Sequence, residues 1–230
     1  MILIDSHIHL DDNSFNDINK AVGFISNELR NAKIEKGIIL HLLNQKWSVE
    51  EISTSIKKYN NIDAFINIDP FNNAARENFE YGISELGFIG LKLHPRLQNF
   101  KPNQEEVIRL VNFASELNVP VLLDAFPDGD YLYMGIKTTD YFELAKACPN
   151  SKIIIAHFGG HHCIDFMMLA KRTENVYFDF SFSFLYYQNS PVLENILYCM
   201  RSMRYNRIFF GSDYPDRGLK ETLEKSLMIL

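Results

Sequence analysis

Short hydrophobic runs alternate with longer amphipathic stretches along the whole chain. The runs are rich in Ile, Leu, Val and Phe and are continuous, as in parallel strands that are covered on both faces. They lie at 2–9, 36–42, 62–68, 87–94, 119–125, 152–158, 175–181 and 207–213. The stretches between them have helical length and lie near 15–33, 48–59, 72–86, 103–117, 139–147, 161–172, 190–204 and 217–229. The pattern therefore predicts eight strand–helix units.

Eight successive strand–helix units are typical of an α/β protein with a single (β/α)8 barrel of the TIM type. An open, doubly wound sheet is the alternative, and it would be favoured by a glycine-rich phosphate loop after the first strand. The chain has no such loop. Its 230 residues fall within the range of one barrel, so we expect a single domain over 1–230.

The amino-acid composition of the chain limits the kinds of molecule that it can bind. The net charge of -6 argues against nucleic acid, because phosphate binding needs a surplus of Lys and Arg. No apolar run approaches the length of a membrane span. Cys148, Cys163 and Cys199 are odd in number and lack metal-ligand spacing, which indicates reduced thiols in a cytoplasmic protein. We expect a small-molecule substrate and no membrane partner, and the many aromatic residues would permit a homodimer.

Polar residues follow the hydrophobic runs at the ends that share one face of a barrel, where barrel enzymes place their sites. His7 and His9 end the first run and point the same way, because a strand alternates its faces. Asp213 ends the last run, and the first and last strands of a closed barrel are neighbours. Two imidazoles and a carboxylate that meet there can ligate one divalent cation. A capping or hydrogen-bonded role is the alternative for each.

Further candidates end the middle strands. Lys92 and His94 share a face of the fourth run, where Lys92 could hold a substrate carboxylate or pair with a buried acid such as Asp5 or Asp124. Asp124 follows three aliphatic residues and needs a metal, a lysine or a hydrogen-bond donor there. His157 could polarise a substrate carbonyl, stabilise developing negative charge or bind the metal.

Two arginines and an aspartate complete the set. Arg96 and Arg217 lie just beyond strand ends and could clamp a substrate carboxylate, although a solvated arginine is an equal alternative for each. Asp179 ends the seventh run, and we interpret it as part of a polar layer inside the barrel mouth rather than as a catalytic group.

Four ordered motifs resemble the amidohydrolase superfamily, and most closely its amidohydrolase-related branch, which includes the aminocarboxymuconate semialdehyde decarboxylase-like enzymes. They are His7-Ile8-His9, Gly90-Leu91-Lys92-Leu93-His94-Pro95, Ala156-His157-Phe158-Gly159-Gly160 and Gly211-Ser212-Asp213-Tyr214-Pro215. The resemblance implies a distorted (β/α)8 barrel with one divalent metal, commonly zinc. It also implies that a histidine pair, a strand-5 histidine and a strand-8 aspartate ligate the metal, while the strand-6 histidine acts on the substrate.

The chain departs from this family pattern at strand 5, where Asp124 stands in place of the usual histidine. An aspartate can ligate zinc or a harder metal such as manganese. The expected ligands are therefore His7, His9, Asp124 and Asp213, with zinc first and manganese second. The same branch contains lactone hydrolases that work without metal, so a metal-free site is the alternative.

The sequence favours a hydrolase of a small polar amide or lactone, with metal-activated water as the nucleophile. Asp213 would take the proton from that water, while His157 and Lys92 stabilise the oxyanion, and His94, Arg96 and Arg217 would bind the substrate. The first alternative is a non-oxidative decarboxylase in which an arginine anchors the leaving carboxylate. The second is a metal-free lactonase, and the third is an inactive barrel that binds a ligand.

Overall fold

The structure is a computed structural model that describes residues 3–230, so Ile2 of the first predicted strand lies outside the described residues. Eight parallel strands pair in chain order. They are β1 (Ile4–Ile8), β2 (Lys36–Leu40), β3 (Ile62–Asn67), β4 (Gly90–Leu93), β5 (Val121–Leu123), β6 (Ile153–Ile155), β7 (Val176–Asp179) and β8 (Ile208–Phe209). The long helices between and after them are α1 (Ile18–Asn31), α2 (Val49–Ile56), α3 (Ala75–Ser84), α5 (Glu105–Glu116), α7 (Thr138–Ala147), α8 (Cys163–Ala170), α10 (Pro191–Ser202) and α11 (Leu219–Ile229).

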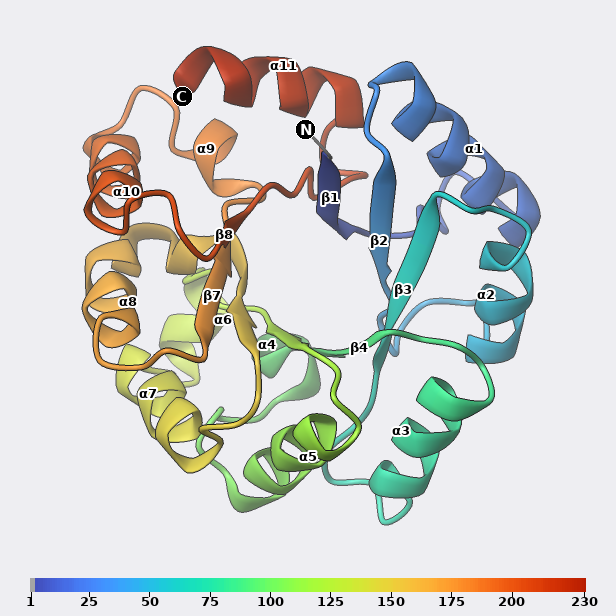
Figure 1. The fold of residues 1–230 in the computed structure, drawn as a ribbon, viewed down its shortest axis with the longest axis horizontal. Coiled ribbons are helices and arrows are strands. Elements are labelled where there is room, and N and C mark those ends of the chain that lie inside the picture. The colour runs from blue at the N-terminus through green and yellow to red at the C-terminus, as the bar shows by residue number, and fades with distance from the viewer. Residues whose placement is uncertain (1–2) are drawn as a thin grey trace.

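The first and last strands meet and bring the sheet round on itself. Ser6 N donates to Phe210 O at 2.9 Å, and His9 N donates to Tyr214 O at 2.7 Å. The helices surround the strands as an outer ring (Figure 1). The predicted (β/α)8 barrel is therefore confirmed, and each of the eight hydrophobic runs contains one of its strands.

Side chains alternate between the two faces of each strand, and the two faces contribute to two separate hydrophobic clusters. Ile39, Ala64 and Leu91 belong to a large cluster that includes the buried faces of the helices. Leu40, Phe65, Leu122 and Ile154 form a second, smaller cluster and face the inside of the barrel. Continuous hydrophobic runs were the signal for this arrangement, because both faces of each strand are buried.

The loops at the carboxyl ends of the strands hold structure that the hydrophobic pattern does not predict. Short helices α4 (Pro95–Gln98), α6 (Gly129–Tyr133) and α9 (Ser183–Tyr186) lie between the predicted strands and the predicted helices that follow them. Two of these helices have a side-chain N-cap. His94 Nδ1 accepts from Leu97 N in α4, and Asp128 Oδ1 accepts from Tyr131 N in α6. A helix of four or five residues is too short to show a 3.6-residue periodicity.

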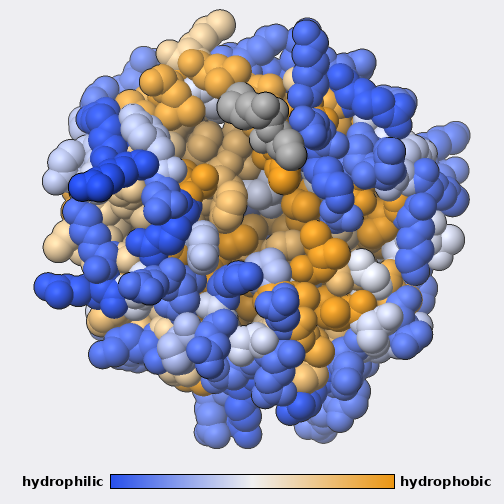
Figure 2. Space-filling view, in the orientation of Figure 1, coloured by the Kyte–Doolittle hydropathy of each residue, from blue (hydrophilic) through white to orange (hydrophobic). Residues whose placement is uncertain are grey.

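The surface agrees with the amphipathic pattern of the helices. Hydrophobic residues gather toward the middle of the view, over the barrel, and hydrophilic ones lie around its outer rim (Figure 2). Over residues 3–230, every helix is too short or too polar to cross a lipid bilayer.

Candidate functional site

His7, His9 and Asp213 meet where β1 lies beside the segment that follows β8. The two Nε2 atoms of the histidines are 3.2 Å apart. Asp213 Oδ1 lies 3.2 Å from His7 Nε2 and 3.7 Å from His9 Nε2. The backbone fixes the aspartate as well, because Asp213 N donates to His7 O at 2.9 Å. The structure thus brings together three of the four predicted metal ligands.

The other ring nitrogens of the two histidines determine which nitrogen carries hydrogen. His7 Nδ1 lies 3.0 Å from Asp179 Oδ2, and His9 Nδ1 lies 2.9 Å from Leu40 O. A carboxylate and a carbonyl only accept hydrogen bonds, so both Nδ1 atoms must donate. Burial lowers the pKa of His7 against the opposing charges of Asp179 and Asp213, and burial with the charge of Lys92 holds the pKa of His9 well below its usual value. Both rings are therefore neutral, with lone pairs on Nε2.

This donor set fits a divalent metal ion. Two Nε2 lone pairs and one carboxylate oxygen converge, and neither imidazole carries a proton between them. The short contact between the two nitrogens is repulsive unless a cation lies among them. Neutral imidazoles oriented by a carboxylate and a carbonyl are the arrangement that metal sites use.

Asp179 is the residue whose role the sequence interpretation missed. It is fully buried, and besides His7 it accepts from His157 N at 3.1 Å and from Ser181 N at 3.0 Å. Burial opposes its ionisation, but the interaction with His7, which includes a hydrogen bond from that ring, and the charge of His157 bring the pKa of Asp179 well below its usual value. Asp179 therefore orients His7. The available signal was its position at the end of a strand, on the same face of the barrel as the histidine pair.

A second group lies across the mouth, in the segments that follow β4, β5 and β6. Asp124 Oδ1 accepts from Arg96 Nε at 2.9 Å, and Asp124 Oδ2 lies 3.1 Å from His157 Nε2 and 3.6 Å from His94 Nε2. Although burial would raise the pKa of Asp124, its interactions with His94, His157 and Arg96, which include the hydrogen bond from His157, hold that pKa well below the usual value. The carboxylate is thus ionised and shared among three partners.

His157 has acceptors on both ring nitrogens. Nε2 faces the Asp124 carboxylate, and Nδ1 lies 3.0 Å from Ser181 O. Both nitrogens must therefore donate, which makes the ring an imidazolium. Burial opposes that charge, but the hydrogen bond to Asp124 and the charges of Asp213, Asp124 and Asp179 raise the pKa of His157 to about 9.

The backbone after β6 turns sharply to place this histidine. His157, Phe158, Gly159 and Gly160 all have positive φ, between 51° and 68°. A Cβ atom on Gly159 would lie 1.9 Å from Phe166 Cδ2, so only glycine fits at that position. The two glycines that follow the strand-6 histidine are thus required by the turn.

Lys92 and His94 are both buried at the same mouth. Lys92 lies in one row of the barrel interior with Asn67, Leu122 and Ile154. Burial lowers its pKa, and the charges of Asp124, Asp179 and Asp213 partly offset that effect. Over residues 3–230, no side chain accepts a hydrogen bond from its ammonium group. Burial also lowers the pKa of His94, to about 3, so that ring is neutral.

The remaining predicted residues differ in their setting. Asp124 lies outside the His7–His9–Asp213 group, and its role as a ligand stays a prediction. Arg96 reaches the mouth but is held by two carboxylates, Asp124 and Asp128. Arg217 is more exposed and pairs with Asp216, at 3.5 Å.

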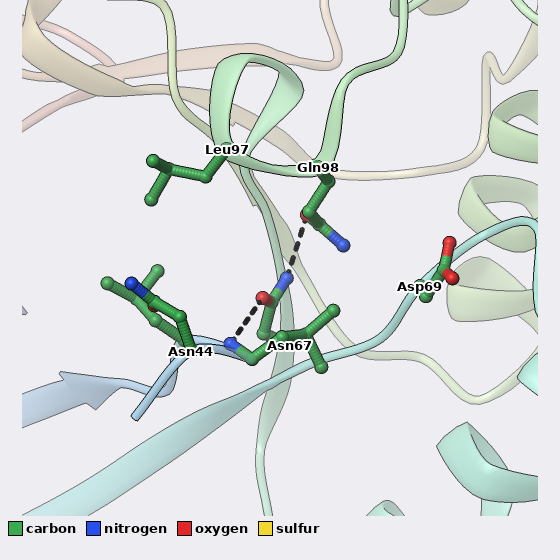
Figure 3. Close-up of a pocket in the computed structure, with 7 residues that line it drawn as sticks. Asn44, Asn67, Asp69, Leu97 and Gln98 are labelled. Atoms are coloured by element: carbon green, nitrogen blue, oxygen red, sulfur yellow. Dashed lines mark hydrogen bonds between the residues drawn. The ribbon is translucent and has the colours of Figure 1, made fainter. Parts of the chain in front are cut away.

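A cavity of about 190 Å³ opens between the loops that follow β2 and β3 and the short helix α4. Figure 3 shows Asn67 hydrogen-bonded to Gln98 within it. The amides of these two residues are used by the protein itself, since Asn67 also bonds Leu43 N and Lys92 O, and Gln98 also bonds His94 N and Ile68 O. These hydrogen bonds fix the loop after β4, and they leave few polar groups in the cavity for a ligand. Its lining consists of Leu42, Leu43, Asn44, Asn67, Asp69, Leu97 and Gln98.

A model of the amidohydrolase family matches residues 54–229. No curated protein sequence matches the chain. Solved structures with this fold include a probable 2-pyrone-4,6-dicarboxylic acid hydrolase from Acinetobacter baumannii with citric acid bound, which is 14% identical over 100% of this chain and 92% of that chain, with a TM-score of 0.73. An amidohydrolase from Burkholderia multivorans with bound zinc is 13% identical over 100% and 91%, with a TM-score of 0.67. A 5-carboxyvanillate decarboxylase from Novosphingobium aromaticivorans, complexed with manganese, is 12% identical over 97% and 89%, with a TM-score of 0.65.

Proposed function

The chain belongs to the amidohydrolase family, and from that premise we propose that it is a metal-dependent hydrolase of a small polar amide or lactone. The observation that carries the proposal is the convergence of the two Nε2 lone pairs of His7 and His9 on the Asp213 carboxylate. These three side chains would hold the metal, with zinc as the first candidate and manganese as the second. A bound divalent metal supplies an acidified water, with a pKa lowered from about 15.7 toward 7.

Asp213 is the proton acceptor for the attacking water. One of its oxygens faces the two histidines, and its side chain is 16% exposed, so a water can reach it from the mouth. Its backbone is fixed by the hydrogen bond to His7 O. The carboxylate therefore meets a nucleophile in a set orientation, which favours proton transfer.

His157 and Lys92 provide the positive charge that an oxyanion needs. The imidazolium of His157 is held by Asp124 and Ser181, and the ammonium of Lys92 has no partner among the described side chains. Both N–H groups of His157 are donated to Asp124 and Ser181, so this ring acts through its charge, and Lys92 supplies the hydrogen-bond donor. Fixed positive charge near the point where negative charge develops stabilises the transition state without reorganisation. His94, neutral and buried, borders the same space as a contact for the substrate.

The test combines metal analysis with turnover on a panel of lactones and amides, with dihydrocoumarin as the first probe. We expect about one equivalent of zinc or manganese and hydrolysis of at least one probe. Asp213→Asn should cut turnover by more than about 100-fold while the melting temperature stays close to that of the wild type. Asp216→Asn, an exposed change three residues away, is the matched control. An Asp213→Asn protein with wild-type turnover would remove this residue from the mechanism.

A decarboxylase is the second candidate. The free ammonium of Lys92 favours it, because a buried cation without a carboxylate partner can bind the carboxylate of a substrate. Carbon dioxide release from hydroxylated benzoic acids, without hydrolysis of any lactone or amide, would select this function over the first. Lactone hydrolysis by protein without metal would select the metal-free lactonase.

A further inference from the structure

Arg96 is held by the protein on two sides. Its Nε donates to Asp124 Oδ1 at 2.9 Å, and its Nη1 forms an ion pair with the Asp128 carboxylate. Only 16% of its side chain is exposed. A guanidinium that already satisfies two carboxylates has little capacity left for a third one on a substrate.

The helix that carries Arg96 does not depend on this ion pair for its position. Gln98 Oε1 accepts from Asn67 Nδ2 at 2.9 Å and from His94 N at 2.7 Å, and Gln98 Nε2 donates to Ile68 O at 2.8 Å (Figure 3). These bonds fasten α4 to the end of β3. Arg96 is thus aimed across the mouth from a fixed base.

The carboxylate of Asp124 links Arg96 to His157. One oxygen receives Arg96, and the other receives His157 Nε2 at 3.1 Å. The residue's backbone is held too, because Tyr141 Oη donates to Asp124 O at 2.7 Å. The remaining freedom is rotation of the carboxylate plane, and the bond from Arg96 Nε removes it.

We propose that Asp128 and Arg96 are positioning residues, which hold the Asp124 carboxylate in the plane that receives His157 Nε2–H and so fix the imidazolium beside His7, whose ring centroid is 4.9 Å away. The inference rests on the proposed function. In this arrangement Asp124 acts on His157 rather than on the metal, and neither Arg96 nor Asp128 touches the substrate.

Asp128→Asn is the most informative variant. Asp128 uses Oδ1 to cap α6 through Tyr131 N at 3.0 Å, and asparagine is an equally good cap. An amide has only one oxygen, so once that oxygen caps the helix its NH2 group faces Arg96, and two donors repel. The variant therefore keeps α6 and breaks the chain of contacts. Asp124→Asn breaks it at the next link, and Arg109→Gln, which alters an exposed ion pair on α5, is the control.

The test reads the His157 ring by 1H–15N spectroscopy of the zinc-loaded and the metal-free protein, together with zinc content. We expect a protected Nε2–H signal in the wild type and in Arg109→Gln. In Asp128→Asn it should exchange with solvent at least about tenfold faster, and in Asp124→Asn it should be lost, because a hydrogen bond to a charged group is worth that factor. Zinc content should stay at the wild-type value in both variants.

An unchanged His157 signal in Asp128→Asn would overturn the proposal. Loss of zinc from Asp124→Asn would overturn it as well and make Asp124 a metal ligand. A wild-type protein that binds neither zinc nor manganese would instead contradict the proposed function. The spectrum of the metal-free protein still tests the positioning chain in that case.

Discussion

The two sides of the barrel mouth differ in the charge of their histidines and in how far that charge is balanced. On the β1 and β8 side, His7 and His9 are neutral, and their lone pairs converge on one carboxylate. On the β4 to β6 side, Arg96 and His157 are cations whose charges are already balanced by Asp124 and its neighbours. The proposed divalent cation would complete the first side, whereas the charges on the second side already balance one another. The same residue type, histidine, is thus neutral on one side and cationic on the other, according to what its ring nitrogens face.

The largest expected effect is on the balanced side. Arg96→Gln leaves Asp124 and Asp128 without their shared cation, and breaking a buried ion pair costs about 3–5 kcal/mol. Chemical denaturation should show a decrease of that order in the free energy of unfolding. A decrease below about 1 kcal/mol would mean that the ion pairs do not balance this side.

The pH dependence of the free energy of unfolding, measured in chelator-treated protein, tests the charge state of His157. The folded-state pKa of His157, about 9, lies above the usual 6.5, so its stabilisation is complete below pH 6.5 and is lost as the pH rises through 9. The shift corresponds to about 3 kcal/mol. His157→Gln should therefore show a flatter decline in the free energy of unfolding between pH 7 and 10 than the wild type.

His41 is the matched histidine outside the site, and its pKa is shifted in the opposite direction. It is only 5% exposed, and burial lowers its pKa to about 4. The unfolded chain binds the extra proton first, so stability is lost as the pH falls from 6.5 through 4. His41→Gln should reduce that loss by up to about 3 kcal/mol while leaving the alkaline limb unchanged. Equal behaviour of the two variants would contradict the assignment of their charge states.

The next effect is on metal affinity. Asp179→Asn weakens the orientation of His7, and loss of such an outer partner lowers metal affinity by about 10–100-fold. Competition with a chromophoric chelator measures the change. Affinity equal to that of the wild type would place Asp179 in the polar layer that the sequence alone suggested, without a role at the metal.

Arg217 provides the smallest effect. It is 38% exposed and pairs with one exposed carboxylate, in contrast to Arg96. Arg217→Gln should change the free energy of unfolding by less than about 0.5 kcal/mol. A cost comparable to that of Arg96→Gln would show that exposure does not separate the two arginines.

The barrel and the positions of its polar residues could be predicted from the sequence. Both faces of each strand in a parallel barrel are buried, so each strand appears as one continuous hydrophobic run. The end of each run then located the chemical groups, and the structure brings His7, His9 and Asp213 together as predicted. The sequence did not reveal that Asp179 bonds His7, since the two residues are 172 positions apart. It also did not reveal the partners of Arg96, which depend on how two loops from different strands face each other.

The central claim is that the β1 and β8 side is built for a divalent cation, and zinc titration of metal-free wild type beside His9→Gln tests it most directly. We predict one tight site in the wild type and an affinity more than about 100-fold lower in the variant, because a lost ligand costs more than a lost outer partner. Equal affinity in the two proteins, or no binding in the wild type, would contradict the claim.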